Sequence, residues 1–463
     1  MGSQPRSLIK FKQGDLASLR GRLLADLSKE HFAVLLGKTQ QINGYTIITV
    51  MDLLFPVQSD YNQQSIASLR IKKDFIHHAL VELTRRYDVD TIIDVHTHPF
   101  LQGSVSFSAT DNEDERTFFQ FLRETFAGIR YASIVLSQEK YSARVWTWSK
   151  GAIVARKALL KTQTSREQIA SADFRENTEG YDEKTMVTGA QGFFNRSVPV
   201  LGLEVLRTMM QRQVISIIGV GGLGSIVAEH LIHMGFHALN LVDPDVLEVS
   251  NLNRVVGAYY QDAQQQRSKV EVAKRHLTQI NPHATVVAYK SDVHDQEMES
   301  VLALSDWMIV ATDNHASRLK VQEVSVQYFV PLLSLGVNIT VNGDKVEDMS
   351  GEVITARVGD ALCLSCLNRI NPTKVASERH PDTMIRSELV KRGYVTGQDV
   401  KEPAVKTLNA FVATMAVEML INQYTDMRRH VPILVYENNG AMSVYEDRES
   451  VRVRNKHCFL CGV

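Results

Sequence analysis

The chain has 463 residues, and its 44% hydrophobic and 22% charged content is that of an ordinary globular protein of about two to three domains. Its 51 lysines and arginines balance 52 aspartates and glutamates, and the net charge of -1 gives no support to nucleic acid or a membrane surface as the main partner. No apolar run approaches the ~18 residues that span a bilayer, and no signal-peptide core opens the sequence, so we expect a cytoplasmic protein.

Helical and strand patterns alternate at the start of the chain. The spacing of apolar residues predicts helices at 15–30 and near 71–87. Short apolar runs predict strands at 32–37, 45–50 and 91–95. The first helix is expected to bury one face of leucines, namely Leu16, Leu19, Leu23, Leu24 and Leu27.

The third of these strands runs directly into the motif His96-Thr97-His98-Pro99. Side chains two apart on a strand point to the same face, so both imidazoles can reach one ion. After a glycine-containing loop, Asp111 can supply a third ligand, and two histidines with a carboxylate leave one position on zinc for water. Zinc lowers the pKa of such a water to about 7, and Glu30 is a candidate general base.

Each of these residues also has a structural interpretation. Ser108 can cap a helix that runs through Phe118, Phe121 and Leu122, with Asp111 in its first turn. A lone glutamate at a helix end is most often solvated. A lone H-x-H is more often structural or incidental than a metal site.

The combination resembles the JAMM (JAB/MPN) family of zinc metallopeptidases. Glu30 with its trailing Leu-Leu-Gly, the H-T-H-P motif and Ser108-x-x-Asp111 occur in the family's order, over roughly residues 10–150. The resemblance implies a catalytic zinc held by His96, His98 and Asp111. It implies Glu30 as the general base and Ser108 as a donor to the tetrahedral oxyanion. This α/β domain, placed at 1–160, would cut isopeptide or peptide bonds after the C-terminal glycine of a ubiquitin-like protein.

A change in composition separates this region from the rest of the chain. Residues 161–192 are the expected linker, because Thr, Ser, Glu, Asp and Gly are frequent there and periodicity is weak. Beyond it, a strand is predicted at 214–218, a helix at 225–234 that stops at Gly235, and a strand at 238–242. Between the first strand and the helix lies a glycine turn that contains Gly219, Gly221, Gly222 and Gly224.

The glycine turn predicts a nucleotide site. Glycines let the backbone approach phosphate oxygens, and the N-terminus of the following helix supplies free N–H groups to bind them. Asp243 ends the second strand about 20 residues past the turn, where an acid meets a ribose hydroxyl.

Polar residues farther along indicate which nucleotide binds. Asn251 can donate to phosphate oxygens and Arg254 can offset their charge, and Lys269 begins a helix from which it can reach the same phosphates. Asp313 follows a strand at the carboxyl edge of the sheet and is a natural magnesium partner. The alternatives are a solvated helix face for Lys269 and Arg318, and a turn or cap for Asp313.

Together these segments are similar to the ThiF/MoeB-type adenylating fold, which is shared with ubiquitin-activating enzymes. The matching segments are Gly219-x-Gly221-Gly222-x-Gly224-Ser225, Asp243-x-Asp245, Asn251-Leu252-x-Arg254, Lys269, Ile280-Asn281-Pro282-His283 and Asp313-Asn314-x-x-x-Arg318. The resemblance assigns the ribose to Asp243 and magnesium to Asp313. It assigns the triphosphate of ATP to Asn251, Arg254 and Lys269.

The same resemblance implies a Rossmann-like α/β domain at 193–463. Arg196, after Phe194 and Asn195, is similar to an arginine that enters the ATP site of the partner subunit, which implies a homodimer. The implied reaction is attack of a C-terminal glycine carboxylate on the α-phosphate, which gives an acyl-adenylate and pyrophosphate.

All four cysteines fall in two C-x-x-C pairs, Cys363 with Cys366 and Cys458 with Cys461. This is the form of a structural tetrathiolate zinc site, with a redox pair or free thiols as alternatives. Ubiquitin-activating enzymes place their acyl-accepting cysteine after the first such pair, and here residues 367–406 contain no cysteine. We therefore expect adenylation without a self-thioester, followed by transfer to a partner's cysteine, or to sulfide or persulfide as in sulfur-carrier activation.

The main prediction is a bifunctional enzyme of a bacterial ubiquitin-like protein system. A zinc peptidase or isopeptidase is joined to a Mg-ATP-dependent adenylating enzyme, with a ubiquitin-like protein ending in glycine and a conjugating enzyme as partners. The alternative is processing and activation of a sulfur-carrier protein to a thiocarboxylate for cofactor or metabolite biosynthesis, with a sulfur donor as partner. Two further classes are an NAD-dependent oxidoreductase, favoured only by the glycine turn and Asp243, and a scaffold without turnover.

Overall fold

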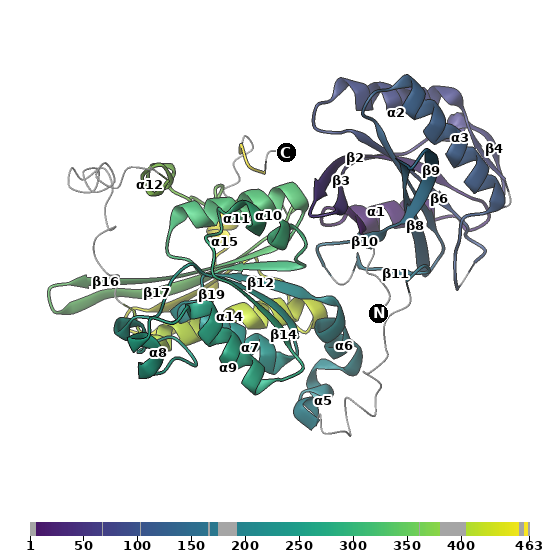
Figure 1. The fold of residues 1–463 in the computed structure, drawn as a ribbon. Helices are drawn as coiled ribbons and strands as arrows, with labels where there is room; N and C mark the ends of the chain where they lie inside the picture. The colour runs from purple at the N-terminus through teal and green to yellow at the C-terminus, as the bar shows by residue number, and fades with distance from the viewer. Residues whose placement is uncertain are drawn as a thin grey trace. The chain divides into compact units, whose positions relative to one another are not determined.

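The computed structural model of the protein describes residues 6–66, 68–101, 103–164, 167–174, 192–360, 362–379, 404–452 and 458–461. The chain divides into two compact units, Met1–Glu176 and Asn177–Val463 (Figure 1). Of the expected linker, residues 165–166 and 175–191 lie outside the described ranges. None of the helices in those ranges combines the length and the apolar character that a bilayer-spanning helix needs.

The first unit is built on a nine-stranded sheet with the order β10-β1-β3-β2-β6-β7-β8-β11, in which β9 also pairs with β8. Its strands are β1 (Ser7–Lys10), β2 (Phe32–Ile42), β3 (Tyr45–Leu54), β6 (Thr91–Thr97), β7 (Arg130–Leu136), β8 (Lys140–Ser149), β9 (Ala152–Lys157), β10 (Leu159–Lys161) and β11 (Ala170–Ser171). A separate ribbon pairs β4 (Tyr61–Gln64) with β5 (Leu69–Ile71). The helices are α1 (Asp15–Leu23), the 3-10 turn η1 (Gln58–Asp60), α2 (Lys73–Arg85) and α3 (Ala109–Thr125).

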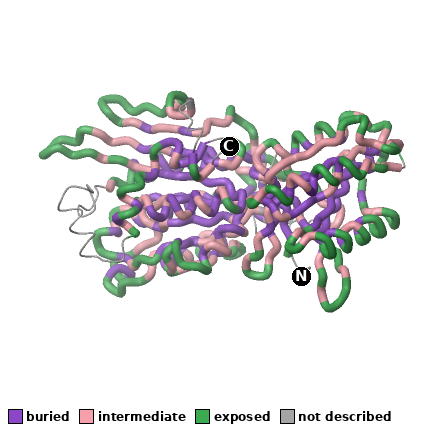
Figure 2. Tube along the Cα trace, turned by 90° about the horizontal axis from the view of Figure 1, so that it is seen from above, coloured by how far each residue is buried: buried purple, intermediate pink, exposed green. Residues whose placement is uncertain are grey.

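Alternation along β2 divides the core of this unit between the two faces of the sheet. Leu35 points to the face covered by α1, where it joins a buried cluster with Leu19. Its neighbour Leu36 points to the other face, where Phe75 of α2 and Phe119 of α3 complete a second cluster. The purple runs in Figure 2 follow these buried strands. The predicted strands at 32–37, 45–50 and 91–95 are confirmed, and each extends beyond the predicted segment.

The predicted extent of the first helix in this unit is wrong. The first helix ends at Leu23, so Leu24 lies at its C-cap and Leu27 is 41% exposed. The cause is a polar turn, because the Asp26 carboxylate accepts hydrogen bonds from both the backbone N–H and the hydroxyl of Ser28 and so competes with the helix.

The helix expected after Ser108 is confirmed as α3, which contains Phe118, Phe121 and Leu122. In α3 the buried side chains are Glu115, Phe119 and Leu122, whereas Phe121 is 46% exposed. These three positions are four and three residues apart, which is the spacing of one helical stripe. Phe118 is only half-buried at the edge of that stripe.

The second unit contains an eight-stranded sheet with the order β14-β13-β12-β15-β16-β17-β18-β19. Its strands are β12 (Val214–Ile218), β13 (Ala238–Val242), β14 (Thr285–Tyr289), β15 (Trp307–Val310), β16 (Leu332–Asn342), β17 (Lys345–Ala356), β18 (Ile433–Asn438) and β19 (Met442–Glu446). The pairs from β14 to β16 are parallel, and the remaining pairs are antiparallel. The chain runs from β12 outward to β14 and then returns to β15, so the topological switch point lies between β12 and β15.

Helices cover both faces of this second sheet. The helices described in this unit are η3 (Gly192–Phe194), α5 (Val198–Leu201), α6 (Leu203–Arg212), α7 (Gly222–Met234), η4 (Val249–Asn251), α8 (Tyr260–Gln264), α9 (Lys269–Ile280), α10 (Gln296–Ala303), α11 (His315–Tyr328), α12 (Pro372–Glu378), α14 (Lys406–Thr425) and α15 (Arg448–Arg452). Figure 1 shows α7, α9 and α14 on one face of the sheet and α10 and α11 on the other. This is the doubly wound α/β arrangement, in which ligands bind at the carboxyl ends of the strands beside the switch point.

Candidate active sites

The glycine turn connects β12 to α7 at the switch point of the second sheet. Gly219 has a φ of +87°, and a Cβ built on it would lie 3.0 Å from the backbone of Ala311. A Cβ on Gly224 would lie 1.9 Å from the carbonyl oxygen of Gly219, so only glycine allows the turn to close this tightly. The predicted strand is confirmed, and α7 starts earlier than predicted, at Gly222, and ends at Gly235 as predicted.

Both carboxylate oxygens of Asp243 accept hydrogen bonds that hold the glycine turn and the segment after β13. Its Oδ2 accepts a 2.7 Å hydrogen bond from the N–H of Val220, and its Oδ1 accepts one of 2.9 Å from the N–H of Asp245. Burial raises the pKa of this carboxyl, against the opposing effects of Lys269 and the two N–H groups. The sequence predicts only the ribose contact, and the structural role in the turn is new.

Two cations lie at the mouth of the turn. Lys269 begins α9, as predicted, and its Nζ lies 2.7 Å from Asp245 Oδ2 and 4.0 Å from Asp243 Oδ1. The side chain of Arg254 covers the turn, because a Cβ on Gly222 would lie 2.9 Å from its Cδ. A triphosphate entering here would meet both positive charges.

The other predicted ATP ligands, Asn251, Asp313 and Arg318, differ in their exposure and in their hydrogen bonds. Asn251 is 9% exposed, and its Oδ1 accepts a hydrogen bond from the N–H of Glu248 at the start of η4. Asp313 is exposed just past β15, beside the switch point, and the helix cap there is Asn314. Arg318 does not lie on a solvated helix face, because its guanidinium donates to the Thr312 carbonyl oxygen at 3.2 Å.

Asn409 on α14 is a candidate site residue that the sequence did not reveal. A Cβ on Gly222 would lie 2.4 Å from its Nδ2, so its amide packs directly on the glycine turn. The side chain is 3% exposed, and its Oδ1 has no hydrogen-bond partner within the described residues. No motif marks this position, because α14 reaches the turn only through the tertiary fold.

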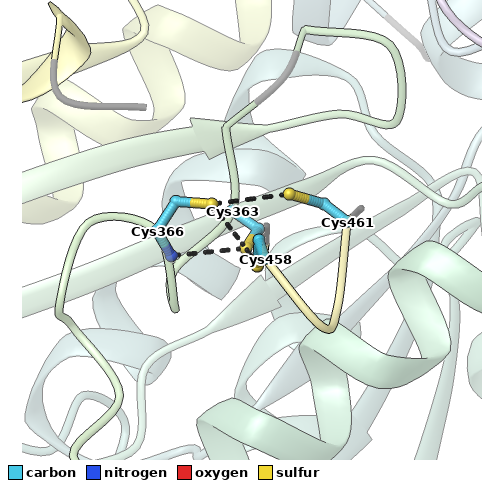
Figure 3. A group of neighbouring side chains, drawn as sticks. All are labelled: Cys363, Cys366, Cys458 and Cys461. Carbon is cyan, nitrogen blue, oxygen red and sulfur yellow. Dashed lines mark hydrogen bonds between the residues drawn. The ribbon is translucent and has the colours of Figure 1, made fainter. Parts of the chain in front are cut away.

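The four cysteines come together in the second unit (Figure 3). Their sulfur atoms all lie within 4.8 Å of one another, and the Cys363–Cys458 and Cys366–Cys461 pairs are 3.6 and 3.5 Å apart. A tetrahedral zinc with 2.3 Å bonds to sulfur needs S···S separations of about 3.8 Å. The cysteines are not joined in disulfides, so the cluster fits a tetrathiolate metal site.

In the first unit, β6 and the start of α3 bring the H-x-H motif and Asp111 together. Asp111 Oδ2 lies 3.5 Å from His96 Nε2 and 3.9 Å from His98 Nε2. His96 Nε2 is buried and has no hydrogen-bond partner in the described part of the chain. A buried, unpartnered imidazole nitrogen beside a second imidazole and a carboxylate is a donor set that fits zinc.

Glu30 lies beside this donor set, with its Oε1 3.9 Å from His98 Nε2. The ribbon strand β4 fixes its backbone, because Gln64 Nε2 donates to the Glu30 carbonyl and the Glu30 N–H donates to the Ser65 carbonyl. The side chain is 8% exposed, and burial raises the pKa of its carboxyl. Burial next to His96 also lowers the pKa of His98 to about 4.

Ser108 and Asp111 form the capping box of α3, and Asp111 also lies beside the two histidines. Ser108 is the N-cap of α3, and its hydroxyl oxygen accepts a 3.1 Å hydrogen bond from the N–H of Asp111. Asp111 Oδ2 accepts a 2.6 Å hydrogen bond from the N–H of Ser108 and still lies next to both histidines. The capping box therefore orients the carboxylate toward the imidazoles.

Comparison with known proteins bears on the second unit. The sequence model of the ThiF family matches residues 194–460. Molybdopterin-synthase adenylyltransferase of Escherichia coli is 30% identical over 270 residues, which cover 58% of this chain and 95% of that protein. The adenylyltransferase and sulfurtransferase uba4 of Aspergillus clavatus is 35% identical over 273 residues, or 57% of this chain and 50% of that protein.

The chain spans about half the length of the Aspergillus clavatus relative, and it matches 28% of the uba4 protein of Aspergillus terreus at 34% identity. Among solved structures, E. coli MccB with MccA-N7isoASN has a TM-score of 0.47 and 17% sequence identity. That likeness covers 58% of this chain and 75% of the MccB chain.

Proposed function

The chain belongs to the ThiF family through residues 194–460, and from this premise we propose that it adenylates the C-terminal carboxylate of a ubiquitin-like sulfur-carrier protein. The observation that carries the proposal is the family match together with Lys269 and Arg254 at the mouth of the glycine turn. The sequence alone favours a conjugation system over sulfur-carrier activation. The relatives reverse that order, because both are named adenylyltransferases and one is also named a sulfurtransferase.

The residues at the turn suit this reaction. The backbone N–H groups and the two cations would hold the triphosphate, and Asp313 would hold the magnesium that offsets its charge. A carboxylate oxygen of the carrier's terminal glycine forms a bond to the α-phosphorus, the bond from that phosphorus to the bridging oxygen breaks, and pyrophosphate leaves. The product is a mixed anhydride that a sulfur nucleophile can open.

The chain itself offers no thiol for a covalent intermediate. All four cysteines lie in the cluster that we propose to bind zinc, and three of them are buried. Thiolates that bind zinc are poorly available as nucleophiles. We therefore propose that the acyl group passes directly from the adenylate to a separate sulfur donor.

Arg196 extends the proposal to a homodimer. It is exposed between η3 and α5, and the neighbouring Phe194 is buried in the core of the unit. A guanidinium anchored in this way can reach a second copy of the chain without disturbing its own fold. We propose that it enters the ATP site of the partner subunit.

ATP–pyrophosphate exchange tests the adenylation. We expect exchange with a ubiquitin-fold carrier that ends in a free glycine, and none with the same carrier amidated at that glycine. Mass spectrometry of the carrier after addition of a sulfur donor should then show a thiocarboxylate. Absence of exchange with glycine-ending carriers would refute the proposal. Formation of an isopeptide conjugate in place of the thiocarboxylate would favour the conjugation system over sulfur-carrier activation.

We propose a second activity, zinc-dependent peptidase cleavage after the carrier's glycine, for residues 1–160. It rests on the resemblance to JAMM metallopeptidases and on the buried, unpartnered Nε2 of His96 beside His98 and Asp111. Zinc, when bound, would supply Lewis acidity and make a water more acidic. Glu30 would take up a proton from that water, since its carboxylate lies beside His98. Ser108 accepts a bond from the Asp111 N–H, so its own hydroxyl proton is available for the oxyanion.

A carrier with a short extension after its glycine tests the peptidase. The full chain loaded with zinc should remove the extension, and Glu30→Gln should abolish removal while zinc remains bound. Cleavage that persists in Glu30→Gln, or the lack of cleavage by zinc-loaded wild type, would refute this second proposal.

A further inference from the structure

A buried arginine behind the first site makes three contacts with the segment that carries Asp111. Arg144 on β8 is 8% exposed, and its guanidinium carbon lies 3.6 Å from the centre of the Phe107 ring. Its Nη1 donates a hydrogen bond to Asn112 Oδ1. Its Nε donates to Glu115 Oε2 at 2.9 Å, and its Nη2 lies 2.8 Å from the same oxygen.

These contacts enclose the capping box from both sides. Phe107 immediately precedes Ser108, and Asn112 immediately follows Asp111. The Phe107 ring also meets the His96 ring edge-on, with centroids 6.1 Å apart and an interplanar angle of 65°. Arg144 therefore contacts the residues on both sides of the capping box, Phe107 and Asn112. The Phe107 ring in turn packs against His96.

Glu115 ties this arrangement to the sheet. It is 5% exposed and accepts hydrogen bonds from Trp146 Nε1 at 2.9 Å and from the hydroxyl of Ser133. Because the carboxylate of Glu115 and the guanidinium of Arg144 are both buried, each depends on the other for charge compensation. These hydrogen bonds fix the N-terminal half of α3 against β7 and β8.

We propose that Arg144, with Phe107, Asn112 and Glu115, forms an Arg144 clamp that positions Asp111 against His96 for metal binding. The proposal rests on the metal site proposed above. In this role Arg144 is a positioning residue, since it touches none of the reacting groups. Partners that orient metal ligands typically change metal affinity by about 10- to 100-fold when they are removed.

Cobalt titration of the full chain tests the clamp. Cobalt bound by thiolates gives intense charge-transfer bands, whereas cobalt on histidine and carboxylate gives only weak visible bands, so the cysteine cluster is an internal reference. We expect Phe107→Leu, Asn112→Ala and Arg144→Lys to weaken the histidine–carboxylate site by about 10- to 100-fold and to leave the thiolate bands unchanged. Asn112→Asp, which keeps an acceptor for Arg144, should retain wild-type affinity.

The matched control is Arg123→Met. Arg123 also projects from α3 onto an aromatic ring of β8, with its guanidinium carbon 3.8 Å from the centre of the Trp148 ring, but it is exposed and remote in sequence from the capping box. It should leave both cobalt sites unchanged.

The outcomes separate the clamp from the site that it serves. If wild type shows only the thiolate bands, the metal site itself is refuted. If wild type binds cobalt at both sites and the clamp variants bind it equally well, the clamp alone is refuted. Should Arg144→Lys fail to fold, Asn112→Ala decides, because Asn112 is exposed and its replacement leaves the buried ion pair intact.

Discussion

At the scale of single residues, the charges of the proposed ATP site are paired with one another. Lys269 Nζ is bound to Asp245, which is itself exposed, and lies within 4.0 Å of the buried Asp243. A surface ion pair of this kind contributes only about 0–1 kcal/mol to the free energy of unfolding. We therefore expect Lys269 to matter more for the proposed phosphate binding than for the stability of the fold.

Lys269→Met should lower the rate of carrier-dependent ATP–pyrophosphate exchange by about 100- to 1,000-fold, because a preorganised charge on the reacting phosphates is lost. The free energy of unfolding, measured with urea, should change by less than about 1 kcal/mol. Lys274→Met, on the same helix, is the control and should keep the wild-type exchange rate. An unchanged exchange rate in Lys269→Met would show that Lys269 does not bind the phosphates of ATP.

At the scale of elements, different glycines of the glycine turn are needed for the fold and for the proposed ligand. A methyl group on Gly224 would lie 1.9 Å from the Gly219 carbonyl oxygen, whereas one on Gly221 would meet no atom within 4 Å. Gly224→Ala should therefore lower the free energy of unfolding by at least about 2 kcal/mol.

Gly221→Ala should lower the free energy of unfolding by less than Gly224→Ala does, since a methyl group on Gly221 would meet no atom within 4 Å. We nevertheless expect it to weaken ATP binding at least tenfold in calorimetry, because the methyl group fills the space that the phosphates would use. Tight ATP binding by Gly221→Ala would show that the phosphates do not approach the turn at this residue.

The cysteine cluster joins two segments that are far apart in sequence. Cys458→Ser should reduce the zinc content of the purified chain from two ions to one and should lower the melting temperature of the second unit, because metal binding is coupled to folding. Ser365→Ala, between Cys363 and Cys366, should leave both quantities unchanged. Unaltered zinc content in Cys458→Ser would exclude the tetrathiolate site.

Local pattern was sufficient to predict many elements of the fold and to indicate residues that the structure brings together at both candidate sites. The β12–α7–β13 segment followed from apolar runs and glycine, and the pairs His96–His98 and Ser108–Asp111 followed from spacing along a strand and at a helix start. The end of α1 did not, because Asp26 ends the helix by a side-chain bond that competes with a favourable leucine pattern. Asn409 and Arg144 were missed because they reach their sites from distant elements, and only packing brings them there.

At the scale of the whole molecule, the chain joins two units with separate cores and separate candidate sites. The family match covers the second unit, and the donor set of His96, His98 and Asp111 lies in the first. If both units serve one carrier tail, the peptidase would expose the glycine that the adenylating unit then activates. A precursor with an extended tail would therefore need both sites, whereas a mature carrier would need only the second.

Two single variants in the full chain test this division. Glu30→Gln should abolish trimming of an extended carrier and keep the wild-type exchange rate with a mature carrier. Lys269→Met should trim normally and fail in exchange. Loss of both activities in either variant would contradict two independent sites.

Trapping of the activated carrier tests the central claim most directly. A mature carrier is incubated with the chain, Mg-ATP and hydroxylamine, and intact masses of both proteins are measured. We predict a hydroxamate on the carrier's terminal glycine, formed only with ATP, and no change in the mass of the chain itself. An unmodified carrier, or a carrier bound covalently to this chain, would contradict adenylation without a self-thioester.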